Sequence, residues 1–333
     1  MIEKVKILII RFSSIGDIVL TTPVVRCLKR QIDGDLELHY LTMQRFRGLL
    51  VNNPYIDQIH SIQKSTNEVI ETLKEENFDY IIDLHKNLRS MRVKKKLKSL
   101  SFSFNKVNIE KWLLVNFKID KMPSVHIVDR YIETCKAFSI EYDGLGLDYF
   151  FPENQNYIVN LPENFNSAYI AIVIGANHNT KRLPTNRLIE LVEQIDRPIV
   201  LLGGQKDVEI AEEVLKSTDQ AIYSAVGNAS FDQSAYLIKE ASIVISPDTG
   251  MMHIAAAFNK KIISLWGNTV PSLGMYPYLK KGKESNSTIF EVQDLSCRPC
   301  SKIGFDSCPK KHFKCMNQLP LDKIAKLALK KSN

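Results

Sequence analysis

Short apolar runs recur along the chain and alternate with segments of helical periodicity. In the first half, buried-strand patterns predict strands at residues 5–10, 36–41, 58–62 and 80–84. Helical spacing of apolar residues predicts helices at residues 17–29, 67–75 and 124–138. Strands that are separated by helices favour βαβ units and a parallel sheet.

The periodicity fades between residues 144 and 167, a stretch rich in asparagine that contains Pro152 and Pro162. We interpret this stretch as a linker between two domains. At roughly 150 residues per domain, a chain of 333 residues is long enough for two.

The alternation then restarts. Strands are expected at residues 168–174, 199–202, 243–246 and 262–265, and helices at residues 185–195, 207–216 and 250–258. A last amphipathic helix is expected at residues 321–330. The chain is therefore predicted to form an α/β domain over residues 1–155, a second over 165–317, and a C-terminal helix within 318–333 that could pack back on the first domain.

Composition narrows the class of protein. Hydrophobic residues make up 44% and charged residues 24%, which excludes disordered, collagen-like and coiled-coil chains. No apolar run approaches the roughly 18 residues of a membrane-spanning helix, and the run after Lys6 ends at Arg11, too early for a signal peptide. A cytoplasmic protein is expected. The net charge of +7 suits an anionic substrate or membrane surface and is too dispersed to imply nucleic acid.

Ligands of open parallel sheets bind at the carboxyl ends of the strands, so loops that follow strands are the places to search. Residues 11–17 form the first such loop. Gly16 permits a tight turn, and the hydroxyls of Ser13 and Ser14 could cap a helix or contact an anion. Asp17 is either a helix N-cap or a catalytic carboxylate.

Two more loops carry candidate chemistry. In residues 246–253, the backbone N–H groups of Thr249 and Gly250 would attract a phosphate, with His253 nearby; the alternative is an Asp248 N-cap and a packed histidine. In residues 175–181 and just beyond, Lys181 or Arg182 could meet phosphate charge, unless the loop is a solvated turn.

Two segments together resemble glycosyltransferase family 9, the lipopolysaccharide heptosyltransferase family. They are IIRFSSIGDIVLTTP at residues 9–23 and SPDTGMMHIAAA at residues 246–257, in the family's order and separation. The resemblance spans nearly the whole chain. It implies a GT-B fold, in which two Rossmann-like, doubly wound parallel-sheet domains face each other across a cleft. The first domain would bind the acceptor and the second the nucleotide sugar.

The resemblance also implies roles for individual residues. Asp17 matches the family's catalytic base, and Lys181 matches a donor-contacting lysine. The family's donor-phosphate loop corresponds to Asp248, Thr249, Gly250 and His253. The family's usual Trp-Pro after that lysine is absent, because Leu183 precedes Pro184. This departure leaves the identity of the sugar open.

A basic stretch follows the fourth expected strand. Residues 86–98 carry seven lysines and arginines and no acid. Such a run is either a solvated helix face or a site for an anionic acceptor or lipid headgroups. No interleaved aromatic residues support nucleic-acid binding. The candidate acceptor-binding residues are Ser13, Ser14, Gly16, His85, Lys86, Arg89 and Arg92.

Four of the six cysteines lie within 19 residues: Cys297, Cys300, Cys308 and Cys315. Four thiolates, or three with His312, could bind a structural zinc ion. Reduced buried thiols and disulfides are the alternatives, and the disulfides are disfavoured in a reducing compartment.

The expected function is an inverting glycosyltransferase that needs no cofactor and moves a sugar, with heptose from ADP-heptose as first choice, to an inner-core lipopolysaccharide acceptor. Peripheral contact with the cytoplasmic face of the inner membrane would accompany it. One alternative is a GT-B enzyme that uses another nucleotide sugar or cell-envelope glycan. Another is a non-catalytic protein that binds anionic glycolipid.

Overall fold

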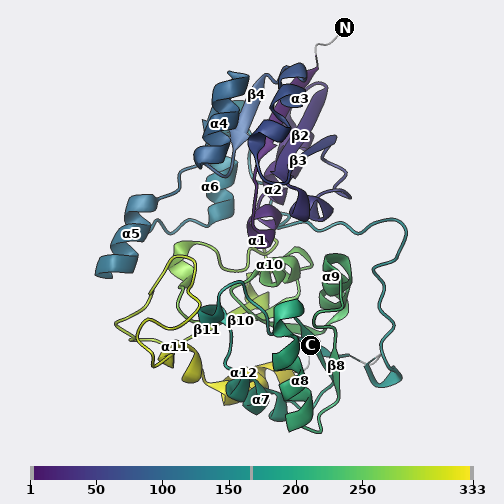
Figure 1. Cartoon of the computed structure of the whole chain (residues 1–333), viewed down its shortest axis with the longest axis vertical. Helices are drawn as coiled ribbons and strands as arrows, with labels where there is room; N and C mark the ends of the chain where they lie inside the picture. The colour runs from purple at the N-terminus through teal and green to yellow at the C-terminus, as the bar shows by residue number, and fades with distance from the viewer. Residues whose placement is uncertain (1–3, 166–167, 331–333) are drawn as a thin grey trace. The chain divides into compact units, whose positions relative to one another are not determined.

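The computed structural model describes residues 4–165 and 168–330, and the chain folds into two compact units (Figure 1). Unit 1 comprises Met1–Lys106 and Val125–Pro152, and unit 2 comprises Val107–Ser124 and Glu153–Asn333. The division near residue 152 falls inside the expected linker, whose last two residues, 166–167, lie outside the described residues. The sequence predicted residues 107–124 as part of the first domain, whereas the structure groups them with unit 2.

Unit 1 is built on a five-stranded parallel sheet in the order β3-β2-β1-β4-β5. The strands are β1 (Val5–Ile10), β2 (Leu36–Met43), β3 (Gln58–Ile62), β4 (Tyr80–Asp83) and β5 (Leu100–Ser103). The four strands predicted in this half are confirmed within two residues at their ends. The pattern did not reveal β5, because it is only four residues long and its Leu100 is exposed.

The helices of unit 1 pack around this sheet. They are α1 (Ile15–Val19), α2 (Thr22–Gln31), α3 (Ile70–Glu75), α4 (Leu88–Leu97) and α6 (Ile127–Glu133), with 3-10 turns η1 (Gln44–Leu49), η2 (Thr66–Glu68) and η3 (Lys136–Phe138). The prediction of one helix over residues 17–29 is wrong. The hydroxyls of Thr21 and Thr22 donate to the carbonyls of Ile18 and Val19, and Pro23 has no N–H to continue the first helix.

Unit 2 holds a six-stranded parallel sheet in the order β11-β10-β9-β6-β7-β8. Its strands are β6 (Ile170–Val173), β7 (Ile199–Leu202), β8 (Ile222–Ser224), β9 (Ile243–Pro247), β10 (Lys261–Trp266) and β11 (Ser287–Glu291). The four predicted strands are the central ones, which are buried on both faces. The two that were missed, β8 and β11, are the half-buried edge strands.

The helices of unit 2 are α5 (Asn108–Phe117), α7 (Thr185–Glu193), α8 (Val208–Ser217), α9 (Phe231–Glu240), α10 (Gly250–Ala257), α11 (Lys314–Asn317) and α12 (Leu321–Leu329). Its 3-10 turns are η4 (Glu163–Phe165), η5 (Asn179–Lys181), η6 (Gln205–Asp207), η7 (Pro271–Leu273) and η8 (Glu284–Asn286). The C-terminal helix α12 buries Leu321 and Ile324 in the core of unit 2 beside Leu188 of α7. It therefore belongs to unit 2, and packing back on the first domain stays a prediction.

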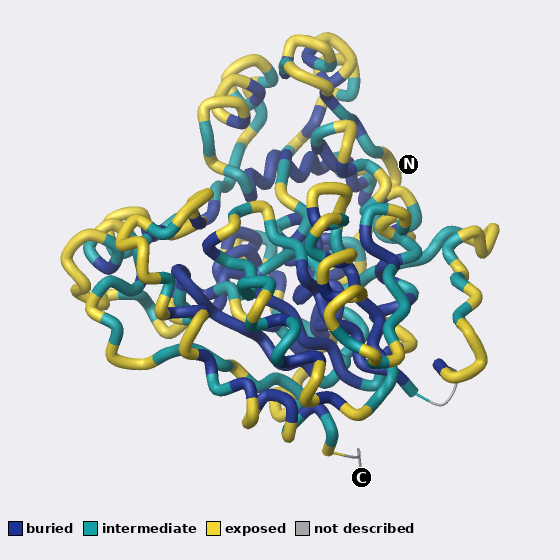
Figure 2. Tube along the Cα trace, turned by 60° about the horizontal axis from the view of Figure 1, so that its bottom comes forward, coloured by how far each residue is buried: buried dark blue, intermediate teal, exposed yellow. Residues whose placement is uncertain are grey.

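Burial follows the sheets in both units. Figure 2 shows the central strands as buried segments and the outer turns of the helices as exposed ones. The described residues contain no helix that is both long and apolar enough to cross a bilayer.

The strand order fixes where each unit can bind a ligand. In unit 1 the chain starts at β1 and moves outward to β3, then returns to the other side of β1 at β4. In unit 2 the corresponding neighbours are β6 and β9. At such a switch point the connections leave in opposite directions, which opens a crevice at the carboxyl ends of the two strands. The loops after β1 and β4, and those after β6 and β9, border these two crevices.

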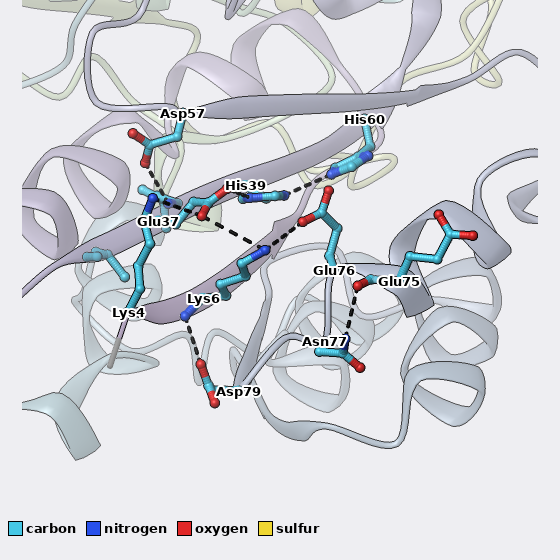
Figure 3. A network of polar contacts seen from close by, with 12 residues as sticks. Lys4, Lys6, Glu37, His39, Asp57, His60, Glu75, Glu76, Asn77 and Asp79 are labelled. Carbon is cyan, nitrogen blue, oxygen red and sulfur yellow. Dashed lines mark hydrogen bonds and ion pairs between the residues drawn. The ribbon is translucent and has the colours of Figure 1, made fainter. Parts of the chain in front are cut away.

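A polar network lies on β2 and β3 in unit 1, away from the carboxyl ends of the strands (Figure 3). His39 Nδ1 and His60 Nε2 are 2.9 Å apart, and His39 Nε2 is 2.8 Å from Glu37 Oε1. Because the Glu37 carboxylate can only accept, we assign the proton to His39 Nε2, which leaves His60 Nε2 as the donor to His39 Nδ1.

Ion pairs of Lys6 with Glu37 and Glu76 complete the network. Lys6 Nζ lies 2.8 Å from Glu76 Oε2 and 3.9 Å from Glu37 Oε2. The hydrogen bond from His39, together with Lys4 and Lys6, lowers the pKa of Glu37 to about 2. Burial, helped by the nearby His39 ring, lowers the pKa of His60 to about 4. The network therefore holds a hydrogen-bonded histidine pair between the carboxylates of Glu37 and Glu76.

Acid should destabilise the fold through His60. The unfolded chain protonates this residue below pH 6.5, whereas the folded chain does so only below about pH 4, so stability is lost as the pH falls through this window. We expect His60→Gln to abolish about 2 kcal/mol of the wild-type loss between pH 7.0 and 4.5, measured by urea unfolding. The control is His312→Gln, since His312 is exposed. Equal pH dependence in wild type and His60→Gln would contradict the assignment.

Candidate active site

Asp17 lies in the loop and short helix that follow β1. It is the third residue of α1, and its Oδ2 accepts hydrogen bonds from the backbone N–H of Ser14 at 3.1 Å and from the Ser14 hydroxyl at 2.8 Å. Ser14, not Asp17, is the N-cap of α1. The interpretation of Asp17 as an N-cap is therefore wrong. Its side chain keeps 19% of its surface exposed, enough for a small group to reach it.

Arg11 holds the other oxygen of Asp17. Its Nη2 is 2.6 Å from Asp17 Oδ1, its Nε donates to the Ser13 carbonyl at 2.7 Å, and its Nη1 donates to the Leu84 carbonyl and the Tyr131 hydroxyl. Burial would lower the pKa of the Arg11 guanidinium, but the charge and hydrogen bond of Asp17, together with the hydroxyls of Tyr131 and Tyr40, leave that pKa raised. The guanidinium thus joins the ends of β1 and β4 and fixes the direction of the carboxylate.

His85 borders the same crevice from the end of β4. Its ring meets Phe12 edge-on at 5.3 Å between centroids. Burial first, then the positive charges of Arg11 and Lys106, lower the pKa of His85 to about 4, so the ring is neutral at pH 7. Its Nδ1 is buried and has no hydrogen-bond partner among the described residues.

Asp83 explains how the β4 loop is built. This carboxylate is fully buried, and its Oδ1 accepts the backbone N–H groups of His85 and Lys86 at 3.1 and 2.7 Å. Its Oδ2 accepts the Ser90 hydroxyl at 2.8 Å and lies 3.0 Å from Lys94 Nζ. The same carboxylate therefore orients the loop and fastens the first two turns of α4.

The predicted acceptor-binding residues fall into two groups. Ser13, Ser14, Gly16 and His85 belong to the two loops at the ends of β1 and β4, with Gly16 buried. Lys86 and Arg89 are exposed where α4 begins, whereas Arg92 lines a separate hollow between α3 and α4. Their contacts with an acceptor stay a prediction.

In unit 2, Lys181 and Asp248 meet at the switch point between β6 and β9. Lys181 Nζ is 2.6 Å from Asp248 Oδ2 and 3.2 Å from the Asp248 carbonyl. The hydroxyl of the buried Thr269 donates to the same Oδ2 at 2.9 Å. Asp248 therefore positions the ammonium group of Lys181, and the loop after β6 is not a solvated turn.

The start of α10 lies directly after Asp248. Thr249 takes the N-cap position, so the alternative of an Asp248 N-cap is wrong, and Gly250 is the first helical residue. The first N–H groups of a helix have no acceptor within it, and they carry the positive end of the helix dipole. They lie beside the Lys181 ammonium group, a combination suited to a phosphate. His253 is 2% exposed and packs within α10.

Arg182 has a different role from Lys181. Its Nη1 lies 2.9 Å from Asp207 Oδ1, and its guanidinium donates twice to the Ala176 carbonyl. Asp207 also accepts the N–H of Gly204 at 2.8 Å, and a side chain at Gly175 would overlap its carboxylate. Arg182 therefore fastens the loops after β6 and β7 to each other.

One group of metal-ligating side chains stands close together among the described residues. It consists of His39, His60 and Glu76, whose ligand atoms all lie within 4.8 Å of one another. Their hydrogen bonds to each other and to Lys6 already occupy these atoms. Asp33 and Asp35 form an Asp-x-Asp pair, and carboxylates of this kind can bind a metal ion. Both are exposed just before β2, at the amino ends of the strands, whereas the switch point lies at the carboxyl ends.

The cysteine cluster forms no disulfide among the described residues. Cys297 Sγ is 3.9 Å from His312 Nε2, and Cys300 Sγ donates to the Cys297 carbonyl. Burial, with smaller effects from neighbouring thiols, raises the pKa of Cys300 to about 11, and burial raises that of Cys315 to about 12. A tetrahedral zinc site needs four thiolate or imidazole ligands close to one another. Among the described residues, the ligand atoms of this cysteine cluster do not form a group of three or more within 4.8 Å of one another. Structural zinc stays a prediction.

The sequence did not reveal three supporting residues. Tyr131 and Thr269 act through contacts with residues distant in the chain, and Arg11 combines such contacts with nearer ones to Ser13 and Asp17. Arg11 lies in the segment of residues 9–23, where it is the one cation and Asp17 is the one acid. This pairing of single opposite charges is the signal that could have identified Arg11. Nothing local marks Tyr131 or Thr269.

The chain resembles known proteins over most of its length. The model of glycosyltransferase family 9 (heptosyltransferase) matches residues 67–306. Lipopolysaccharide heptosyltransferase 1 of Campylobacter coli is 24% identical over 292 residues, which cover 79% of this chain and 84% of that protein.

Two solved structures share the fold. E. coli ADP-heptose lps heptosyltransferase II has a TM-score of 0.66 and 20% identity, and the match covers 96% of this chain and 99% of that one. E. coli heptosyltransferase WaaC with ADP has a TM-score of 0.67 and 19% identity, and the match covers 97% and 98%. The predicted GT-B class is confirmed.

Removing the Arg11 guanidinium should destabilise unit 1. We expect Arg11→Met to lower the free energy of unfolding by about 3 kcal/mol, because it removes the donor to the Leu84 carbonyl and the cation beside the Asp17 carboxylate. Urea unfolding of the full chain measures this. The control Arg89→Met removes an exposed arginine and should change stability by less than about 0.5 kcal/mol. A similar small effect for both variants would contradict the role given to Arg11.

Proposed function

Because the chain belongs to glycosyltransferase family 9, we propose that it transfers a heptose from ADP-heptose to an inner-core lipopolysaccharide acceptor. The proposed reaction inverts the anomeric centre and needs no metal. One relative is named as lipopolysaccharide heptosyltransferase 1, and two solved structures are named with ADP-heptose or ADP. The observation that carries the proposal is the Lys181–Asp248 pair beside the start of α10, because a fixed cation next to helix N–H groups supports the binding of a diphosphate.

Asp17 is the proposed base. An acceptor hydroxyl would donate a hydrogen bond to the exposed part of this carboxylate, and its proton would pass to Asp17 as the oxygen attacks the anomeric carbon. Arg11 faces the charge of the carboxylate and directs it. A carboxylate is a weak base, so the proton moves late, when the new bond has made the hydroxyl acidic. Arg11 is a positioning residue in this scheme.

Lys181 and the first N–H groups of α10 are proposed to stabilise the departing ADP. Negative charge grows on the diphosphate as its bond to the sugar breaks, and fixed donors that face this charge lower the barrier. Asp248, which also accepts the Thr269 hydroxyl, holds the ammonium group in place. Asp248 therefore acts through Lys181 rather than on the phosphate, which a carboxylate would repel.

Neutral His85, at the end of β4, is proposed to lie against the acceptor. Lys86 and Arg89 are exposed at the start of α4 and would meet carboxylate or phosphate groups of an anionic acceptor. These contacts would set acceptor affinity rather than the chemical step.

A second candidate is a GT-B enzyme of another nucleotide sugar. Leu183, which stands where the family has tryptophan, favours it, since an aromatic contact beside the donor lysine is missing. A non-catalytic glycolipid-binding protein is disfavoured by the intact donor-binding loop.

Two substitutions should separate chemistry from donor binding. Asp17→Asn keeps the shape but not the base, so transfer should fall at least about 1,000-fold while the Kd for ADP changes less than about twofold. Lys181→Met should weaken ADP binding about 10- to 100-fold. Chromatographic transfer assays and calorimetry measure the two quantities, with Lys206→Met, an exposed lysine, as control. Near-normal transfer by Asp17→Asn would remove Asp17 from the role of base.

A donor panel tests the nucleotide. Calorimetry with ADP-, UDP-, GDP- and dTDP-sugars should show binding of the ADP-sugar at least about tenfold tighter than the rest, which is a difference of about 1.4 kcal/mol. Tightest binding of another nucleotide would exclude ADP-heptose and favour the second candidate.

A further inference from the structure

The outer face of α4 carries a cationic and an apolar part. Four of its cations, Arg92, Lys95, Lys96 and Lys98, line a hollow of about 900 Å³ between α4 and α3, together with Lys74 and Asn67. On the same face of α4 stand Leu88 and Met91, which are 78% and 55% exposed. We call these residues of α4 and its C-cap the α4 face.

No carboxylate of residues 4–165 and 168–330 forms an ion pair with the cations of the α4 face. Lys94 turns inward to Asp83 and Ser103, and Lys74 of α3 pairs with Glu71 at 3.0 Å. Arg92, Lys95, Lys96 and Lys98 form no ion pair with any carboxylate in the described part of the chain. Glu71 and Glu75 are the acids of α3 nearest in sequence to Lys74, fewer than the cations opposite them.

Such a cluster works against the stability of the isolated helix. Like charges three and four residues apart repel each other, and exposed Leu88 and Met91 gain nothing from water. A partner that offers many negative charges beside an apolar layer would satisfy both parts at once. The chemistry that combines these features is the headgroup region of a membrane with anionic phospholipids.

We propose that the α4 face docks unit 1 onto an anionic membrane surface. The four cations would meet lipid phosphates, and Leu88 and Met91 would enter the boundary between headgroups and acyl chains. Docking needs no nucleotide sugar and does not rest on the proposed function.

Two other occupants fit less well. A soluble phosphate is usually held by several directed donors, whereas the cations here are mostly lysines, which act as mobile point charges, with Asn67 as the neutral polar neighbour. An acidic protein would not require Leu88 and Met91 to stay exposed at one end of the cationic row. The cations are spread along a ten-residue helix. A membrane surface with anionic lipids attracts such a row of charges without requiring a fixed spacing between them.

Vesicle binding of the full chain tests the proposal. Sedimentation with vesicles of about 70% phosphatidylcholine and 30% phosphatidylglycerol should retain the wild type, and vesicles of pure phosphatidylcholine should not. Lys95→Gln/Lys96→Gln/Lys98→Gln should weaken binding to the anionic vesicles about 100-fold, at about fivefold for each lysine. Leu88→Gln/Met91→Gln should weaken it about tenfold or more.

The matched control is Lys280→Gln/Lys281→Gln/Lys283→Gln, three exposed lysines of unit 2. Both triple variants lower the net charge from +7 to +4, so only a specific α4 face makes them differ. Equal binding by the two triple variants would overturn the proposal, and so would equal binding of wild type to neutral vesicles. The proposal would also be overturned if the wild type bound inorganic pyrophosphate but not vesicles, and if the α4 triple variant lost pyrophosphate binding. The α4 face would then be a site for a soluble anion.

Two further measurements separate docking from folding and from catalysis. Circular dichroism should be unchanged in the α4 triple variant, and urea unfolding should show no loss of stability, because its three side chains are exposed and their mutual repulsion is removed. Its transfer of sugar to a water-soluble, lipid-free acceptor should also be unchanged, while transfer to acceptor in anionic vesicles falls. A vesicle-binding defect thus separates from a failure of the proposed reaction, which the Asp17 and donor experiments test.

Discussion

Parallel strand order constrains everything else in this protein. Each sheet begins at an inner strand, and the chain later returns to the other side of that strand, at β4 in unit 1 and at β9 in unit 2. Parallel connections cannot cover the carboxyl ends at that point, because they leave in opposite directions. Chemistry placed on these loops is therefore open to ligands while its backbone stays anchored in a buried sheet.

Both units use an opposite-charge pair at the switch point, with the signs exchanged. In unit 1 the buried cation Arg11 fixes the partly exposed anion Asp17, and in unit 2 the anion Asp248 fixes the cation Lys181. The supporting residue of each pair makes a further hydrogen bond: Arg11 donates to the Tyr131 hydroxyl, and Asp248 accepts from the Thr269 hydroxyl. Ion pairing of this kind sets direction as well as charge, since one geometry satisfies all the hydrogen bonds.

Helix α4 connects the switch point of unit 1 with its outer surface. Buried Asp83 fastens the loop that carries His85 and accepts the inward-facing Lys94. The remaining cations of the helix are thereby left to face outward, where Lys95 and Lys96 line the hollow beside α3. One helix thus serves the candidate acceptor loop on one side and presents unpaired positive charge on the other.

The sequence by itself determined the α/β class, the central strands, the family resemblance and the loops that carry Asp17, Lys181 and Asp248. These features are local: apolar periodicity and short motifs are written in neighbouring residues. Only the tertiary structure decided that Arg11 holds Asp17, and that Asp248 supports Lys181 rather than capping α10. Partners 67 residues apart, as Lys181 and Asp248 are, leave no periodic trace, because strand order rather than sequence distance brings them together.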